Sequence, residues 1–227
     1  MTDLRVISIG ALAANPLWGE RNPVRTGHAT TTLIRAGERT ILVDPGLPEA
    51  ALIARLRERV NLNPRDITDV FLTSFRPDCR RAISSFPDAE WWIAESEREG
   101  AGIPLVDALR RAAEGGDDEL QQMLAQDIAV LERCKAAPDK LAPHVDLFPL
   151  PGATPGLCGL LVADQRHTTL ICGDAIPTLD HLEQGKVLQN CADAEAAMRS
   201  FTEAIEIADL LVLGRDNLVV NPTKRPF

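Results

Sequence analysis

Short runs of β-branched and apolar residues occur in both halves of this 227-residue chain, separated by a long segment without them. Such runs are typical of β-strands when Gly, Pro or Asp residues bound them. The candidate strands are residues 4–10, 30–36, 39–44, 68–74 and 90–94 in the first half, and 144–148, 157–163, 168–172 and 210–213 in the second. Because helical stretches separate several of these strands, the pattern predicts an α/β architecture with two sheets covered by helices.

Three stretches have a helical pattern. Residues 48–60 begin with a proline and continue as an amphipathic run, and residues 192–207 are similar. The long segment at about 95–140 mixes charged residues with Ala and Leu around Gly115-Gly116, which predicts two helices. We expect a single domain over residues 1–227 in which this segment is a helical insert. The insert could cap a substrate cleft or pack between subunits.

The charge balance excludes several classes of protein. The chain has 24 Lys and Arg against 33 Asp and Glu, a net charge of −9, which disfavours nucleic-acid binding. No apolar run approaches the roughly 18 residues of a membrane span, and the chain opens without a basic, signal-like segment. Its five cysteines are scattered without a CxxC pair. We therefore expect a cytoplasmic protein with neither a nucleic-acid nor a membrane partner.

Five short motifs follow one another in an informative order. They are ILVDPG at 41–46, VFLTS running into FRPDCRR at 70–81, PLPGATPG at 149–156, LICGDA at 170–175 and LVLGRD at 211–216. In this order and in these secondary-structure contexts, the set resembles the metallo-β-lactamase superfamily over nearly the whole chain. The resemblance implies an αββα sandwich of two mixed β-sheets flanked by helices.

The resemblance also implies where metal ligands would lie. In that family the loop after the fourth of these strands reads T-H-x-H-x-D-H, and its imidazoles and carboxylate hold a pair of metal ions that activate water. Here the first two His positions are Ser74 and Arg76, the Asp is kept as Asp78, and the third His is Cys79.

The remaining ligand positions are altered in the same way. The family's G-H-T-P-G turn has Ala153 in place of its His, the bridging Asp is kept as Asp174, and the last His aligns with Arg215. Every histidine ligand that the family would supply is therefore replaced.

Metal chemistry gives a consequence that does not depend on the family. A hydrolytic zinc site keeps about three protein ligands and an open position, and these positions offer only Asp78, Asp174 and Cys79. A guanidinium has no lone pair to donate, and a unit charge about 4 Å from a dication costs roughly 8 kcal/mol at an effective dielectric constant of about 20. We expect no metal cofactor. The alternative is a single zinc, manganese or iron ion on those three residues.

The two arginines suggest what replaces the metal. Without a dication, Asp78 and Asp174 would repel each other in a partly buried site. We expect Arg76 and Arg215 to pair with them, so that replacing Arg215 lowers thermal stability. If the arginines point into the cleft instead, they could bind a carboxylate or a phosphate.

Four other residues have competing interpretations. His28 precedes the hairpin and could face the cleft as a ligand, base or anion-binding group, or it could be a loop histidine bonded to backbone. Asp44 resembles the family's structural aspartate that braces the metal-binding loops. We expect His181 to be a solvated surface residue and Cys79 to pack against a helix, although a reactive thiol is the alternative for Cys79.

Three functions fit this pattern. The first is a pseudoenzyme that serves as a binding or assembly protein. The second is a hydrolase of a small ester, lactone or thioester with a reduced metal site, and the third is an anion-binding sensor. A small anionic ligand and a homodimer are the partners that the sequence leaves open.

Overall fold

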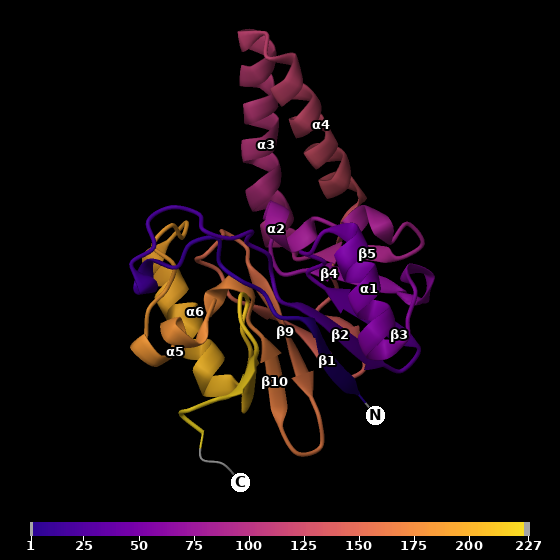
Figure 1. Cartoon of the computed structure of the whole chain (residues 1–227), viewed down its shortest axis with the longest axis vertical. Coiled ribbons are helices and arrows are strands. Elements are labelled where there is room, and N and C mark those ends of the chain that lie inside the picture. Colours follow the sequence, from indigo (N-terminus) through magenta and orange to yellow (C-terminus); the bar gives the residue numbers. More distant parts are fainter. Residues whose placement is uncertain (1, 225–227) are drawn as a thin grey trace.

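The strands form two six-stranded mixed sheets, seen in a computed structural model that describes residues 2–224 (Figure 1). The first sheet has the order β1 (Asp3–Ser8), β2 (Thr31–Ala36), β3 (Arg39–Val43), β4 (Asp69–Leu72), β5 (Glu90–Ile93) and β6 (Lys135–Ala136). The second has the order β12 (Leu218–Val220), β11 (Leu210–Val212), β10 (Thr168–Ile171), β9 (Cys158–Ala163), β8 (Val145–Pro149) and β7 (Lys140–Ala142). Strands β3 to β6 run parallel, as do β10 and β11, and the other neighbours are antiparallel.

The strand pleat explains how the sheets pack. Neighbouring residues of a strand face opposite sides of a sheet. In β4, Phe71 points between the two sheets, whereas Val70 and Leu72 point towards the helices outside. In β10, Ile171 joins the core between the sheets and Leu170 joins the outer core of the second sheet. Each sheet is thus apolar on both faces, which is why helices cover the outer ones.

The helices complete the sandwich predicted from the sequence. They are α1 (Glu49–Val60), α2 (Pro77–Arg80), α3 (Glu95–Gly115), α4 (Asp118–Arg133), α5 (Leu179–Gln184) and α6 (Ala194–Ile207). Apolar residues of α1 pack on the outer face of the first sheet, and those of α5 and α6 pack on the second. The resulting layers are those of an αββα sandwich. Within residues 2–224, no helix combines the length and the apolar character that a membrane span requires.

The insert at about 95–140 is mostly a helical hairpin. Its two helices, α3 and α4, stand away from the sandwich (Figure 1). Gly116 ends α3 in the left-handed conformation, with φ of 70°, and the Asp117 side chain caps the start of α4. The expectation of helix throughout the segment is wrong at its end, because β6 pairs with β5 there.

The sequence also missed several short elements, among them β6, β7, β12 and α5. The three strands have only two or three residues each. A run of that length cannot display a period of two, so pairing with a neighbouring strand decides its conformation. The predicted strands of five or more residues, and the helices α1 and α6, differ from the structure by at most two residues at their ends.

Candidate functional site

The candidate site lies where strands of both sheets end. Arg76 and Asp78 follow β4, Asp174 follows β10, and Arg215 follows β11. Since β4 runs parallel to its neighbours and β10 runs parallel to β11, these residues leave the carboxyl ends of parallel strands. Open α/β sheets place ligand sites at such ends.

Arg215 is the centre of the site. Its Nε donates to Asp174 Oδ1 at 2.7 Å and its Nη2 donates to Asp174 Oδ2 at 2.8 Å. These two hydrogen bonds make a bidentate ion pair. Its Nη1 and Nη2 also contact the two carboxylate oxygens of Asp78. The side chains of Arg215 and Asp174 are each only 2% exposed, whereas Asp78 is 33% exposed. One buried guanidinium therefore bridges two carboxylates, an arrangement that orients all three groups.

Arg76 adds a second cation at the edge of this network. Its Nη1 donates to Asp174 Oδ2 at 3.1 Å, and its Nη2 donates to the carbonyl oxygen of Ala153 at 3.0 Å. Its side chain is 24% exposed. A guanidinium has five N–H donors, so three N–H groups of Arg76 remain without an acceptor from residues 2–224. Both arginines thus lie against the aspartates, as the sequence predicted.

Electrostatics hold Asp174 in its charged form. Burial would raise the pKa of this carboxyl, but the charge and hydrogen bonds of Arg215, helped by Arg76, outweigh burial and lower it. Burial likewise opposes the charge of Arg215, whose pKa is nevertheless raised by Asp174 and the other acidic groups around it. The buried charges therefore persist because each one is paired.

The donor groups do not suit a metal ion. Asp174 and Asp78 direct their oxygens at Arg215, and Cys79 lies 3.8 Å from Arg215 Nη2. Burial raises the pKa of the Cys79 thiol well above its usual range, so the thiolate that binds zinc is disfavoured. Nowhere in the described part of the chain do three or more His, Cys, Asp or Glu side chains gather as metal ligands. The residues present at this position do not fit the group that the family resemblance implies.

Asp44 stabilises the loop that follows β4 through hydrogen bonds. Its carboxylate accepts hydrogen bonds from the backbone N–H of Thr73 at 2.9 Å and from the Thr73 hydroxyl at 2.6 Å. Two residues later, Gly46 lies so close to the backbone of α2 that an added Cβ would be 2.2 Å from the Asp78 carbonyl oxygen. The DPG turn thereby fixes the loop that carries Arg76 and Asp78.

Glu97 is a buried acid that the sequence gave no reason to select. In the first turn of α3, it accepts hydrogen bonds from the backbone of Phe75 at 2.9 Å and of Gly156 at 3.1 Å, and from the Thr154 hydroxyl at 2.7 Å. Burial raises its pKa. Glu97 therefore ties the base of the helical hairpin to two loops of the site, and no motif signals such a long-range role.

A cleft of about 630 Å³ opens above the ion-pair network. Its polar lining includes Arg76, Asp78 and Arg215 together with His181 and Lys186. The walls are mainly apolar and include Leu12, Pro16, Leu17, Val187, Leu188 and Met198. None of the residues lining it belongs to α3 or α4. The hairpin does not act as a cap over this cleft.

His181 differs from the expectation of a solvated surface residue. It is 2% exposed, and its Nδ1 lies 2.8 Å from the Thr178 hydroxyl, which also caps α5. Burial lowers its pKa, so the imidazole is neutral at pH 7. Its place seven residues after Asp174 was the only signal in the sequence, and packing of α5 against the second sheet brings it to the cleft.

Two further residues are assigned by their contacts. His28 is not among the residues that line this cleft, and its ring nitrogens lie 3.3 Å and 3.1 Å from the carbonyl oxygens of Thr26 and Ile9, the contacts of a loop histidine bonded to backbone. Cys79 is buried in α2, with its sulfur 3.4 Å from the Ser74 hydroxyl. It packs inside the protein, as expected for an unreactive cysteine.

Comparison with known proteins places this geometry in a family context. Residues 24–73 match the family model described as the metallo-beta-lactamase superfamily. Among solved structures, a candidate metallo-beta-lactamase from Thermotoga maritima is 18% identical, with a TM-score of 0.69 over 96% of this chain and 99% of the other. No curated protein matches the chain by sequence.

Two further similar structures are named as lactonases. A quorum-quenching N-acyl homoserine lactone lactonase is 20% identical, with a TM-score of 0.62 over 95% of this chain and 91% of its own. AidC, described as a dizinc quorum-quenching lactonase, is 19% identical, with a TM-score of 0.60 over 78% of this chain and 67% of its own. At these identities the likeness establishes the fold.

Replacing Arg215 with Ala should be strongly destabilising. The change leaves Asp174 buried and without its main partner, and breaking a buried pair in this way costs about 3–5 kcal/mol. Urea unfolding would measure the loss. Arg5→Ala is the matched control, because Arg5 forms an exposed pair with Asp3, and its effect should stay within about 0.5 kcal/mol. Equal effects of the two substitutions would contradict the central role of Arg215.

Asp44 should make stability fall as pH rises. Burial raises its pKa from 3.8 to about 7 in the folded protein. The folded state therefore binds more protons than the unfolded chain across this range, and its stability decreases with increasing pH. In Asp44→Asn this contribution disappears. Urea unfolding between pH 4 and pH 8 should therefore show a smaller decline for Asp44→Asn than for the wild type, and parallel curves would disprove the assignment.

Proposed function

We propose that this member of the metallo-β-lactamase superfamily binds a small organic anion in the cleft above Arg215 and does not catalyse the metal-dependent hydrolysis for which the fold is suited. The observation that carries this proposal is the position of Arg215. Its guanidinium bridges Asp78 and Asp174 with its side chain 2% exposed, at the place where the family resemblance puts metal ions.

Asp174 is not suited to replace a metal ion in activating water. Asp174 is ionised but accepts three charge-assisted hydrogen bonds, two from Arg215 and one from Arg76. These bonds lower its basicity. A general base needs a pKa near the working pH, whereas the pKa of Asp174 is held below its ordinary value of 3.8.

The charges around the cleft favour an anion. The two arginines and the two aspartates of the network balance one another, and Lys186 adds one positive charge to the lining that has no ion pair within residues 2–224. Lys186 Nζ contacts only the side-chain oxygen of Gln184 within the described residues, at 2.9 Å. Arg76 has three N–H groups to offer, and a planar guanidinium suits a carboxylate or phosphate. This cationic cleft lies on a protein of net charge −9.

The cleft walls favour an organic anion over an inorganic one. Leu12, Leu17, Leu188 and Met198 supply apolar surface beside the charged floor. Ligand sites commonly combine such walls with a few polar groups that fix orientation. A carboxylate with a short apolar chain would satisfy both: its head would meet Arg76, and its chain would lie against the walls.

A metal analysis combined with hydrolysis assays tests the absence of metal-dependent catalysis. Protein purified without chelator and then incubated with zinc, manganese or iron should retain less than about a tenth of an equivalent, because fewer than three ligands are free. It should leave an N-acyl homoserine lactone, an aryl ester and a thioester unhydrolysed. One tightly bound equivalent that Asp174→Ala removes, together with lactone hydrolysis, would overturn the proposal in favour of a hydrolase.

Calorimetric titration with hexanoate and octanoate tests the binding function. Both should bind, whereas hexanol, which lacks the charge, should not. Arg76→Gln should weaken binding by about tenfold or more, since hydrogen bonds to charged groups contribute about 1.5–3 kcal/mol. Arg59→Gln is the control, because Arg59 contacts only the Val6 carbonyl, outside the cleft. Equal affinity in both variants, or no binding of either carboxylate, would contradict the proposal.

A further inference from the structure

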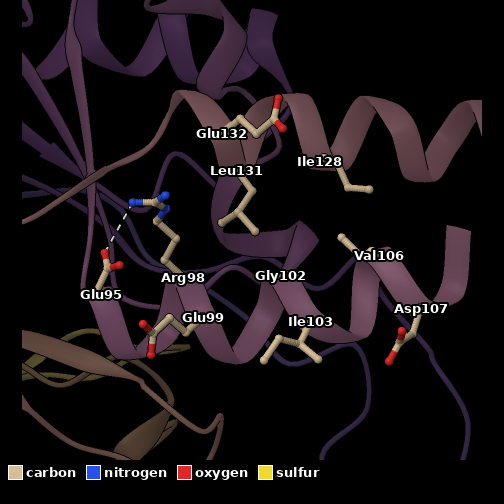
Figure 2. A pocket seen from close by; sticks show the side chains of 10 residues that line it. All are labelled: Glu95, Arg98, Glu99, Gly102, Ile103, Val106, Asp107, Ile128, Leu131 and Glu132. Carbon is tan, nitrogen blue, oxygen red and sulfur yellow. Dashed lines mark hydrogen bonds and ion pairs between the residues drawn. The ribbon is translucent and has the colours of Figure 1, made fainter.

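The helical hairpin has a hollow of its own, far from the Arg215 network. A groove of about 700 Å³ runs along α3 and α4 and is lined by apolar groups at its centre, among them Gly102, Val106, Ile128 and Leu131. Figure 2 shows Val106 directed towards Ile128 across the groove, and Ile103 on the side of α3 that faces away from α4. Nothing in residues 2–224 fills this groove.

The exposed residues of α3 form a stripe at helical spacing. Glu99, Ile103, Val106 and Arg110 follow one another at intervals of four, three and four, so they lie on one face of the helix. Ile103 is 69% exposed and Val106 is 47% exposed, although both are large and apolar. An apolar pair of this size, exposed on a projecting helix, marks an interaction surface.

The charges at the two ends of this stripe have opposite signs. Glu99 lies on one side of the apolar pair, towards the sandwich, and Arg110 lies on the other, towards the hairpin tip. They are eleven residues apart, which is about 16 Å along a helix, so they cannot pair with each other in one chain. The only ion pair of Arg110 among the described residues is a long one, 3.7 Å, to Asp107 on the same helix.

The order of residues along this stripe makes it complementary to an antiparallel copy of the same stripe. If two α3 helices pack antiparallel about a twofold axis near residues 104 and 105, Glu99 faces Arg110 of the second copy. Ile103 then faces Val106 of the second copy. The same register places Val106 of the second copy over Glu99, Gly102, Ile103 and Val106, four positions with the spacing of a hole in knobs-into-holes packing. A twofold interface repeats each of these contacts.

We propose that the hairpin is a dimerisation arm, and that its occupant is the α3 helix of a second copy of this chain, packed antiparallel through the Glu99, Ile103, Val106 and Arg110 stripe. Charge complementarity favours a second copy over an unrelated partner, because the same four residues supply both halves of the contact. The proposal is independent of the cleft, since no residue of the hairpin lines it.

Sedimentation velocity over a concentration series tests the arm in the full chain. The wild type should form a species of twice the 24.7 kDa chain mass, and Ile103→Glu should shift it to monomer. Val24→Glu is the matched control, because Val24 is 62% exposed in the segment between β1 and β2 and belongs neither to α3 nor to the groove, and it should leave the dimer intact. A wild-type monomer at every concentration would overturn the proposal.

Charge reversal tests the antiparallel register. Glu99→Arg or Arg110→Glu alone sets like charges against each other twice in the dimer, and each should raise the dissociation constant by about tenfold. The double variant Glu99→Arg/Arg110→Glu restores opposite charges and should recover the wild-type value. Because both residues are exposed, circular dichroism should show unchanged folding in all three variants. Single variants that dissociate without recovery in the double variant would overturn this register, and so would single variants without effect.

Discussion

The burial of one guanidinium between two carboxylates is the constraint on which the site depends. Arg215 reaches Asp174 from the end of a neighbouring parallel strand, and it reaches Asp78 across from the other sheet. An unpaired charge at this depth would cost several kcal/mol. The loops after β4, β10 and β11 must therefore stay in register with one another, so the ion-pair network ties together the edges of both sheets.

Two further buried acids extend this constraint to the rest of the fold. Asp44 holds the start of the loop after β4 through Thr73, and Glu97 holds the middle of the same loop through Phe75. Glu97 also belongs to the first turn of α3, so the base of the hairpin is bonded to the site. These hydrogen bonds hold the base of the hairpin, while the rest of the hairpin projects from the sandwich (Figure 1).

The protein thus separates two kinds of surface. Above Arg215, cationic and apolar groups converge in a concave site suited to a small molecule. On the hairpin, exposed apolar residues of α3 lie beside a groove and between charges of opposite sign, which suits contact with a second helix. Geometry accounts for this difference. The ends of strands from two sheets can surround a ligand, whereas a projecting pair of helices offers its lateral surface to another protein.

The sequence by itself determined the layers of the fold and much of the site. Apolar periodicity in the long strands predicted two sheets, and the family resemblance, with Arg76 and Arg215 at two of its histidine positions, predicted that arginines pair with Asp78 and Asp174. Only the tertiary structure decided that Arg215 bridges both aspartates while Arg76 keeps free donors, that His181 is buried at the cleft, and that Glu97 bonds to distant loops. These outcomes depend on which chain segments meet across the strand ends. Local periodicity reports which face of an element is buried, but it carries no information about the partner from far along the chain that buries it.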